Sequence, residues 1–501
     1  MTKAHRPWTT AEDESDPFGQ LADALQEISG VEQVAVVVEA VTRAAPRRSG
    51  GASPTSRTAQ PPPPSRTDHR RTEHHPVGRR RPAEAYGGDL PASPRHRRTL
   101  QDALRAAAAA GSDTGLTYLR ADGSADRQSY RELLDEAQQV LGGLRALSVR
   151  PGDAVLFQMG DDRNFLTVLW ACVLGGYAPT PLAPAPGYRR DNDVTRKLRA
   201  VWELLDRPVI VTDERLSGPV RGLGESWGVP GPRVASAERL ARHAADIDWY
   251  PAGPDDVALH LLTSGSSGTP KCVRHTHRGL LALVDGFRIA NGFTARDISL
   301  NWIPLDHVGA LVMTHVRDVV LGCRQVHAKL GAALADPLRC LDWAHAYSVT
   351  NMWAPNFMFG LINDRVGELA DRGWDLSALR HICNGGEAVV AGTAHRFLRL
   401  MGRYGLPADA MRPAWGMSET GSAVTFSRLD AADESVGTIV ADLSSLTGEV
   451  RLVERTGHPG AVMLTQVGPP IPGVRLRIVT TRAPSCRKAR SGGFRWPGRR
   501  C

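Results

Sequence analysis

Hydroxyl-bearing residues, glycines and a lysine crowd into residues 262–273, which read Leu-Thr-Ser-Gly-Ser-Ser-Gly-Thr-Pro-Lys-Cys-Val. The stretch holds, in order, Thr263, Ser264, Gly265, Ser266, Ser267, Gly268 and Lys271. Glycine lets backbone N–H groups approach an anion closely, hydroxyls add hydrogen-bond donors, and lysine adds a mobile positive charge. These residue types in this spacing predict a loop that holds a polyphosphate.

The apolar segment before this loop indicates how it is positioned. Residues 256–262 are typical of a buried strand, and α/β folds place phosphate sites in glycine-rich turns directly after such strands. A flexible surface linker is the simpler reading of the loop, and the preceding strand argues against it. The loop is not a P-loop, because Lys271 follows Thr269-Pro270 and Cys272 stands where a magnesium-binding hydroxyl would be.

Three later segments carry side chains suited to the same chemistry. One is an apolar turn, Pro304-Leu-Asp-His307, and another follows an apolar strand at 379–383 with Gly385, Gly386 and Glu387. The third joins an aromatic ring, a hydroxyl and a carboxylate in Trp415, Gly416, Met417, Ser418, Glu419 and Thr420. Each alone is more often structural, but their order after the phosphate loop favours a shared site.

Helical and strand patterns alternate from residue 99 onward. We expect helices over 100–110, 131–147, 164–175, 194–205 and 277–290. We expect strands over 115–119, 126–130, 153–158, 208–212 and 298–303, and a proline-rich turn over 179–186. This alternation predicts an α/β fold in which mainly parallel sheets are flanked by helices.

The two ends of the chain differ from this middle part. Residues 16–42 suggest a short helix and a strand, so that 1–43 form a small appendage. Residues 44–98 are rich in Pro, Arg, Ser and His and predict a disordered linker. The basic excess of the chain lies in 44–98 and in a tail at 480–501, without basic helices or interleaved aromatic residues, which argues against nucleic-acid binding.

Composition excludes several other classes. With 42% hydrophobic and 23% charged residues, the chain has the composition of a globular protein. No apolar run approaches the ~18 residues of a membrane span, and the first residues do not form a secretion signal. Seven cysteines at irregular spacing give no disulfide framework, so we expect a cytoplasmic protein.

Together these segments resemble the AMP-forming acyl-, aryl- and aminoacyl-adenylating synthetases and ligases. Thr263–Lys271 is similar to the family's Thr-Ser-Gly-Ser/Thr-Thr-Gly-x-Pro-Lys-Gly loop, departing from it at Ser267 and Cys272. Trp415-Gly-Met-Ser-Glu419 is similar to Tyr-Gly-x-Thr-Glu, and residues 128–133 and 172–184 match two earlier segments. The resemblance covers about residues 97–480. It implies the large N-terminal subdomain of an adenylate-forming enzyme, here over 99–479.

Within that family the chain most resembles fatty acyl-AMP ligases and the domains that load acids onto polyketide and nonribosomal peptide assembly lines. Pro304-Leu-Asp-His307 is closer to the Pro-Leu-x-His form of acyl and aryl activators than to the aromatic-Asp pair of amino-acid activators. The amino-acid activators use that Asp to hold the ammonium of the substrate. Asp306 therefore keeps an amino acid open as the substrate.

The resemblance implies ATP and Mg²⁺ as cofactors and a role for each segment. Thr263–Gly268 and Lys271 would hold the β- and γ-phosphates, Ser418 and Thr420 would contact phosphate, and Glu419 would bind Mg²⁺. Trp415 would stack on adenine beside Gly385–Glu387, within a loop that includes Gly416 and Met417. His307 would border the carboxylate of the acid. Lys271, His307 and Glu419 are thus the expected catalytic residues.

The resemblance ends near Val479, and residues 480–501 resemble nothing in the family. We therefore expect the family's smaller C-terminal lid domain to be absent, through a frameshifted or prematurely ended reading frame. The expected function is ATP-dependent activation of a carboxylic acid and its loading onto a carrier-protein phosphopantetheine, impaired without the lid. Two alternatives stay open, an acyl-CoA ligase and a non-catalytic interaction or scaffold protein that keeps the fold.

Overall fold

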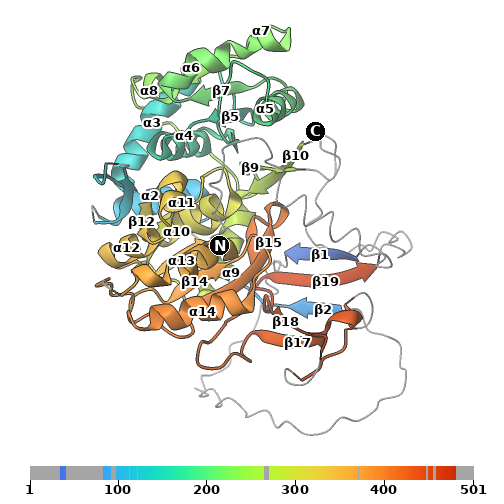
Figure 1. The fold of residues 1–501 in the computed structure, drawn as a ribbon. Coiled ribbons are helices and arrows are strands. Elements are labelled where there is room, and N and C mark those ends of the chain that lie inside the picture. Colours follow the sequence, from blue (N-terminus) through green and yellow to red (C-terminus); the bar gives the residue numbers. More distant parts are fainter. Residues whose placement is uncertain are drawn as a thin grey trace, which may run out of the picture.

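The structure is a computed structural model that describes residues 34–40 and 83–480, apart from 92–96, 112, 121, 265–269, 371, 447–449 and 455–458. Two sheets with mostly parallel strands dominate it (Figure 1), and helices cover them. This confirms the predicted α/β class. No helix in the described ranges is long and apolar enough to cross a membrane.

The larger sheet has eight strands in the order β16-β15-β14-β13-β11-β12-β3-β4. Its strands are β3 (Gly115–Leu119), β4 (Ala125–Ser129), β11 (Ile298–Asn301), β12 (Arg324–His327), β13 (Asn351–Ala354), β14 (His381–Asn384), β15 (Met411–Met417) and β16 (Ser422–Phe426). The six inner strands are parallel, and β4 and β16 add antiparallel edges. The carboxyl ends of β11, β13, β14 and β15 therefore lie along one edge.

The smaller sheet is wholly parallel, in the order β6-β5-β7-β8. It contains β5 (Ala154–Gln158), β6 (Ala178–Pro181), β7 (Val209–Thr212) and β8 (Val234–Ser236). Strand β6 corrects the prediction of a turn over 179–186. Two prolines fit in it because β6 is an edge strand of this sheet, where a missing N–H costs no ladder bond on the open side.

Helices surround both sheets, and six of those described begin at an N-cap side chain. They are α2 (Leu100–Ala109), α3 (Tyr130–Ala146), α4 (Asp162–Gly175), α5 (Asp193–Leu204), α6 (Glu214–Arg221), α7 (Leu223–Trp227), α8 (Ala237–Leu240), α9 (His277–Asn291), α10 (Arg317–Leu321), α11 (Leu330–Ala335), α12 (Arg339–Ala346), α13 (Asn356–Asp364) and α14 (Ala391–Gly402). In α3, Ser129 and Glu132 form a reciprocal capping box. The α2, α3, α4, α5 and α9 helices confirm the predicted ones to within two residues at each end.

Three apolar cores among the described residues hold the layers together. One packs α2, α3, α4 and α9 against the sheets and includes Leu133, Trp170 and Phe287. Another lies between β13, β14 and the helices α13 and α14, where Phe359 contacts Phe397 with ring centroids 4.9 Å apart. The smallest packs α5, α6 and α7 against the smaller sheet. A π-helix, η1 (Gly309–Val316), follows the turn that holds His307. Short 3-10 turns are η2 (Val366–Glu368), η3 (Ser418–Thr420) and η4 (Leu443–Ser445).

Three small antiparallel sheets were not predicted. They are the hairpin of β9 (Val257–Ser264) and β10 (Pro270–Thr276), the pair β17 (Thr438–Asp442) and β18 (Ala461–Thr465), and the sheet β1-β19-β2. In the last, β1 (Val34–Ala40) and β2 (Ala83–Tyr86) both pair with β19 (Val474–Thr480).

The strand β2 falls inside the segment predicted as a disordered linker, 44–98. Four residues of a Pro- and Arg-rich segment form a strand here because β19 offers them an edge with which to pair, which composition does not reveal. The strand predicted within 16–42 corresponds to β1. The rest of 1–43, residues 41–82 and the tail after 480 lie outside the described residues.

Candidate functional site

The predicted phosphate loop connects two antiparallel strands, a difference from the expected single strand. Lys271 lies opposite Thr263, and Pro270 opposite Ser264, at the loop end of the β9–β10 hairpin. The Lys271 side chain is exposed, as a ligand contact from solvent requires. Gly265, Ser266, Ser267 and Gly268, and the side chain of Ser264, lie outside the described residues.

The segment Trp415–Thr420 is half strand and half turn, which corrects its prediction as a loop. Trp415, Gly416 and Met417 end β15, and the turn η3 follows. A side chain at Gly416 would overlap the backbone of Ser422, so glycine is required for the antiparallel β15–β16 contact.

Within η3, the hydroxyl of Thr420 serves the backbone. Its Oγ1 accepts the Met417 N–H at 3.1 Å and lies 2.8 Å from the Met417 carbonyl oxygen. It also lies 2.6 Å from the carbonyl oxygen of Ser422, and its one hydrogen can serve one of the two carbonyls. Thr420 therefore shapes the turn. The Glu419 side chain is exposed beside it and can receive a ligand from solvent.

The Gly385–Glu387 segment follows β14 directly, next to β15. A side chain at Gly385 would come within 2.7 Å of the Ala414 carbonyl oxygen, so the two segments are in close contact. Glu387 accepts the Phe357 N–H at 2.6 Å and so caps the start of α13. Its carboxylate supports α13, and the exposed residues Gly386 and Glu387 follow Gly385 beside β15.

His307 stacks on Trp353, with ring centroids 5.0 Å apart and planes 19° from parallel. Its Nδ1 accepts the backbone N–H of Gly309 at 3.1 Å, and burial lowers the pKa of the ring, so it is neutral at pH 7. The six-membered ring of Trp353 fills the space that a side chain would need at Gly309 and at Gly386, at 3.0 and 3.1 Å. Trp353 thus connects the His307 turn to the Gly385–Glu387 segment.

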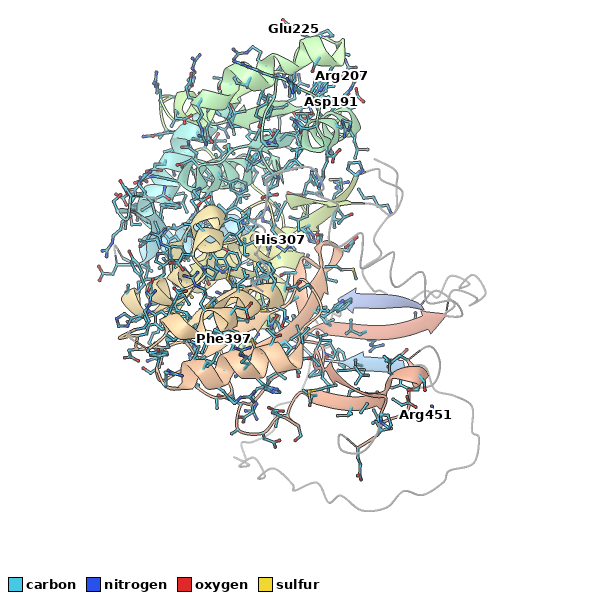
Figure 2. All side chains as sticks on the ribbon, viewed as in Figure 1. Asp191, Arg207, Glu225, His307, Phe397 and Arg451 are labelled. Atoms are coloured by element: carbon cyan, nitrogen blue, oxygen red, sulfur yellow. The ribbon has the colours of Figure 1, made fainter. Side chains whose placement is uncertain are left out.

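Sequence reasoning did not single out Trp353. Its position at the carboxyl end of a buried strand, the usual location of ligand sites in open α/β sheets, is the signal that could have identified it. The structure brings His307, Gly386 and Trp415 to the edge where β11, β13, β14 and β15 end. Figure 2 labels His307 near the middle of the view. In the same region of Figure 1, the β9–β10 hairpin is drawn above β15.

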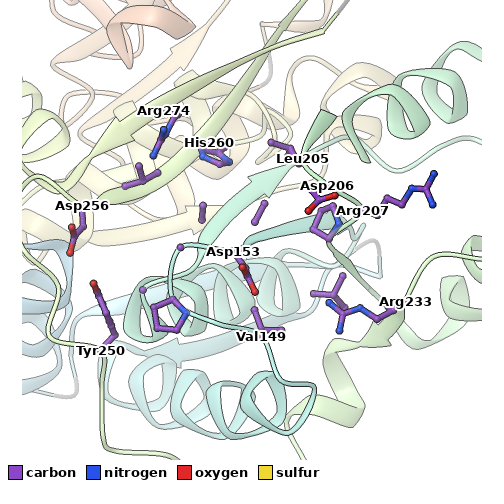
Figure 3. Close-up of a pocket in the computed structure, with 18 of the residues that line it drawn as sticks. Val149, Asp153, Leu205, Asp206, Arg207, Arg233, Tyr250, Asp256, His260 and Arg274 are labelled. Atoms are coloured by element: carbon purple, nitrogen blue, oxygen red, sulfur yellow. The ribbon is translucent and has the colours of Figure 1, made fainter. Parts of the chain in front are cut away.

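A separate polar cavity of about 680 Å³ lies at the edge of the smaller sheet where its parallel strands begin (Figure 3). His260 and Arg274, a cross-strand pair of the hairpin, line it together with Asp153, Asp206 and Tyr250. None of the residues predicted for the site is among its lining residues. The cavity is therefore distinct from the predicted site.

The side chains of the predicted site suit Mg²⁺ bound together with a nucleotide better than a metal ion held by protein side chains alone. Among the described residues, no group of three or more His, Cys, Asp or Glu side chains is arranged to hold a metal ion. Mg²⁺ at nucleotide sites is held by one or two carboxylates together with substrate phosphates and water. The exposed carboxylate of Glu419, near the lysine-bearing hairpin, is suited to that arrangement.

Comparison with known proteins agrees with this geometry. The family model described as AMP-binding enzyme matches residues 104–488. The nonribosomal peptide synthetase btyA of Aspergillus terreus is 32% identical over 67% of this chain and 37% of its own length. Microperfuranone synthase of Emericella nidulans is 31% identical over 60% of this chain and 32% of its own length. The chain thus spans about a third of these relatives.

Solved structures give the same picture. An adenylation domain of a keto acid-selecting NRPS module, bound to keto acyl adenylate, is 45% identical, with a TM-score of 0.74 over 78% of this chain and 72% of that one. McyG A-PCP complexed with phenylalanyl-adenylate is 34% identical, with a TM-score of 0.69 over 78% and 57%. Since the family model covers most of its length, this protein belongs to the AMP-binding enzyme family and has the fold of the adenylation domains of nonribosomal peptide synthetases.

Proposed function

We propose that this chain activates a carboxylic acid with ATP and passes it to the thiol of a carrier protein. In the first step a carboxylate oxygen attacks the α-phosphorus of ATP. The bond from that phosphorus to the β-phosphate oxygen breaks, so pyrophosphate leaves and an acyl-adenylate forms. In the second step a thiolate sulfur attacks the acyl carbon, the bond to the adenylate oxygen breaks, and AMP leaves.

The location of Lys271, Glu419 and His307 on neighbouring segments is the observation that carries this proposal. Two anions must meet in the first step, so charge neutralisation and alignment dominate the catalysis. Lys271 on the hairpin would neutralise phosphate charge, and Glu419 would hold Mg²⁺, which would supply further positive charge against the phosphates. The neutral ring of His307 borders the acid and orients it without adding a charge.

We further propose that the acid is a 2-oxo acid. The 45% identical adenylation domain is described as keto acid-selecting, which supports this substrate class. The state of Asp306 supports it as well. Burial raises the pKa of Asp306, while Lys197 and the backbone N–H of Ala183 act on its carboxylate in the opposite direction. Because burial disfavours its charged form, this carboxyl group is a poor partner for the ammonium of an amino acid.

A carrier-protein thiol is the proposed acceptor because the relative btyA is a nonribosomal peptide synthetase and because McyG was solved as an adenylation domain with its carrier domain. The alternative acceptor, coenzyme A, has no comparable support. An assay with both thiols, each added to the enzyme, ATP and acid, distinguishes them by which thioester forms.

ATP–pyrophosphate exchange tests the first step, with a panel of 2-oxo, 2-amino, aryl and fatty acids. We expect exchange with a 2-oxo acid and little with the matching amino acid. Calorimetry with a stable acyl-adenylate analogue tests binding without turnover. If neither exchange nor binding occurs with any acid, the function fails and the chain is a scaffold that keeps the fold.

A further inference from the structure

A hydrogen bond joins the two segments that hold the proposed ATP-binding residues. His275 of β10 lies 2.8 Å from the carbonyl oxygen of Ser418 through its Nε2. A carbonyl can only accept, so Nε2 carries the proton and donates it. His275 is 7% exposed, and a side chain added at Gly421 would lie 3.4 Å from its ring. One side chain therefore connects the hairpin to the turn η3.

His275 and Lys271 share a face of the same strand. Side chains alternate between the two faces of a strand, so residues 271, 273 and 275 point the same way. Val273 between them is buried, and Arg274 on the other face is exposed. Lys271 and His275 are four positions apart along the strand, a span of about 13 Å. Because a paired strand is stiff, fixing His275 also fixes where Lys271 emerges.

On the η3 side, the residue that accepts the hydrogen bond is the direct neighbour of Glu419, the expected Mg²⁺ ligand. Ser418 is the first residue of η3 and Glu419 is the next. The turn is braced internally by Thr420, so an anchor at Ser418 positions the whole turn. The strand also changes register between His275 and Thr276, and bulges of this kind redirect side chains next to active sites. The irregularity coincides with the residue that makes the link.

We propose that His275 is a positioning residue that sets the spacing between Lys271 and Glu419, and so between the phosphates and Mg²⁺. This inference rests on the proposed function. His275 does not touch ATP in it. It acts by holding Ser418, so that the lysine on the hairpin and the carboxylate on the turn meet the same MgATP.

The variant His275→Leu removes the donor and keeps an apolar side chain in the buried site. We expect it to weaken MgATP binding, measured by calorimetry, by about three- to tenfold, the size of a lost hydrogen bond. His275→Gln can still donate an amide N–H to Ser418 and should restore most of the affinity. A ring that only fills space would give the reverse order, because leucine fills the site at least as well as glutamine.

His260→Leu is the matched control. His260 lies on the other strand of the same hairpin, is equally buried and bonds to Thr180 at 3.1 Å. We expect it to lower stability without changing MgATP affinity. Equal loss of affinity in His260→Leu and His275→Leu would overturn the positioning role.

Hydrogen exchange separates failure of this inference from failure of the proposed function, because it needs no ligand. In His275→Leu the backbone amides of residues 416–421 should exchange faster, with recovery in His275→Gln and no change in His260→Leu. Unchanged exchange there overturns the inference. If His275→Leu shows the accelerated exchange but the wild-type chain binds no MgATP, the link between the segments is supported and the proposed function is overturned.

Discussion

Trp170 donates its indole N–H to Nε2 of His315 over 2.8 Å, in a part of the core where both side chains are buried. Because Nε2 accepts, the ring proton lies on Nδ1, which is 2.9 Å from the amide oxygen of Gln325. A neutral ring satisfies both partners, whereas a protonated ring would direct a second N–H at the indole donor. Burial accordingly lowers the pKa of His315 to about 4.

Folding should therefore be sensitive to mild acid. Burial also lowers the pKa values of three other histidines to about 4, namely His260, His275 and His277. Between pH 6.5 and 4 the unfolded chain binds protons on these rings and the folded chain does not, so stability falls as the pH falls. A single such ring costs roughly 2 kcal/mol at pH 5. Urea unfolding at pH 7 and pH 5 measures the difference.

Buried carboxyl groups oppose this trend, most strongly Asp318. Burial raises the pKa of Asp318 to about 6 although Arg317 pairs with it, so this group adds stability as the pH falls from 6 towards 4. Burial also raises the pKa values of Asp162 and Asp306, by less. The four histidines with pKa values of about 4 outweigh these carboxyl groups, and the net loss should remain. Replacing His315 by Gln, which can accept from the indole and donate to Gln325, should make the slope between pH 7 and 5 shallower. Equal stability at pH 7 and pH 5 in the wild-type protein would contradict this account.

Glu387→Ala should lower the stability of the protein more than its affinity for nucleotide. The side chain caps α13 through the Phe357 N–H, and loss of a helix cap costs about 1 kcal/mol. The adenine contact expected of this segment uses backbone groups instead. Thermal unfolding should show a lower Tm, while calorimetry with ATP should show little change. A large loss of ATP affinity at an unchanged Tm would assign the carboxylate to ligand binding.

The alternation of strands and helices was enough to predict the fold class, and the order of the motifs was enough to predict the family, whereas the roles of the site residues stay predictions. Burial on both faces makes β5 a continuous apolar run, and Ser129 with Glu132 marks the start of α3. These are local signals. They can be recognised in a single sequence because each depends only on residues that are neighbours along the chain.

The features that escaped prediction depend on partners distant in the sequence. The strand β10 exists because Lys271 and its neighbours pair with β9, and β2 exists because β19 lies beside it. Trp353 gains its place from contact with Gly309 and Gly386, which lie on segments far from it in the sequence. Pairing and packing of this kind come from tertiary structure, which composition and periodicity do not encode.

Gly386→Ala should disturb the acid-binding part of the site. Gly386 has a φ of +90°, which strains any other residue, and an added methyl group would lie 3.1 Å from the Trp353 ring. Either the loop or the Trp353 ring must shift, and a shift of the ring would also disturb its stacking on His307. We expect at least tenfold weaker binding of an acyl-adenylate analogue, about 1.4 kcal/mol.

The matched control for that variant is Gly392→Ala. Gly392 lies in α14, and an added methyl group there meets open space, so this variant should keep wild-type affinity. Circular dichroism should show that both variants are folded. Wild-type affinity in Gly386→Ala would separate Trp353 and its contacts from the acid-binding site.

Lys271→Ala should abolish most of the nucleotide affinity while leaving the hairpin intact. The side chain is exposed at the loop end of β10, so its loss should cost little stability. A lysine that meets phosphate contributes a charge-assisted bond, and its removal should weaken ATP binding about ten- to hundredfold. AMP lacks the β- and γ-phosphates, so its affinity should change much less.

Arg274→Ala is the matched control. It removes an equally charged and exposed group three residues along, on the opposite face of the same strand, and should leave both affinities unchanged. Equal losses of ATP and AMP affinity in Lys271→Ala would place the lysine away from the terminal phosphates. A loss of ATP affinity in Arg274→Ala would mean that Lys271 acts only through the general positive charge of the hairpin.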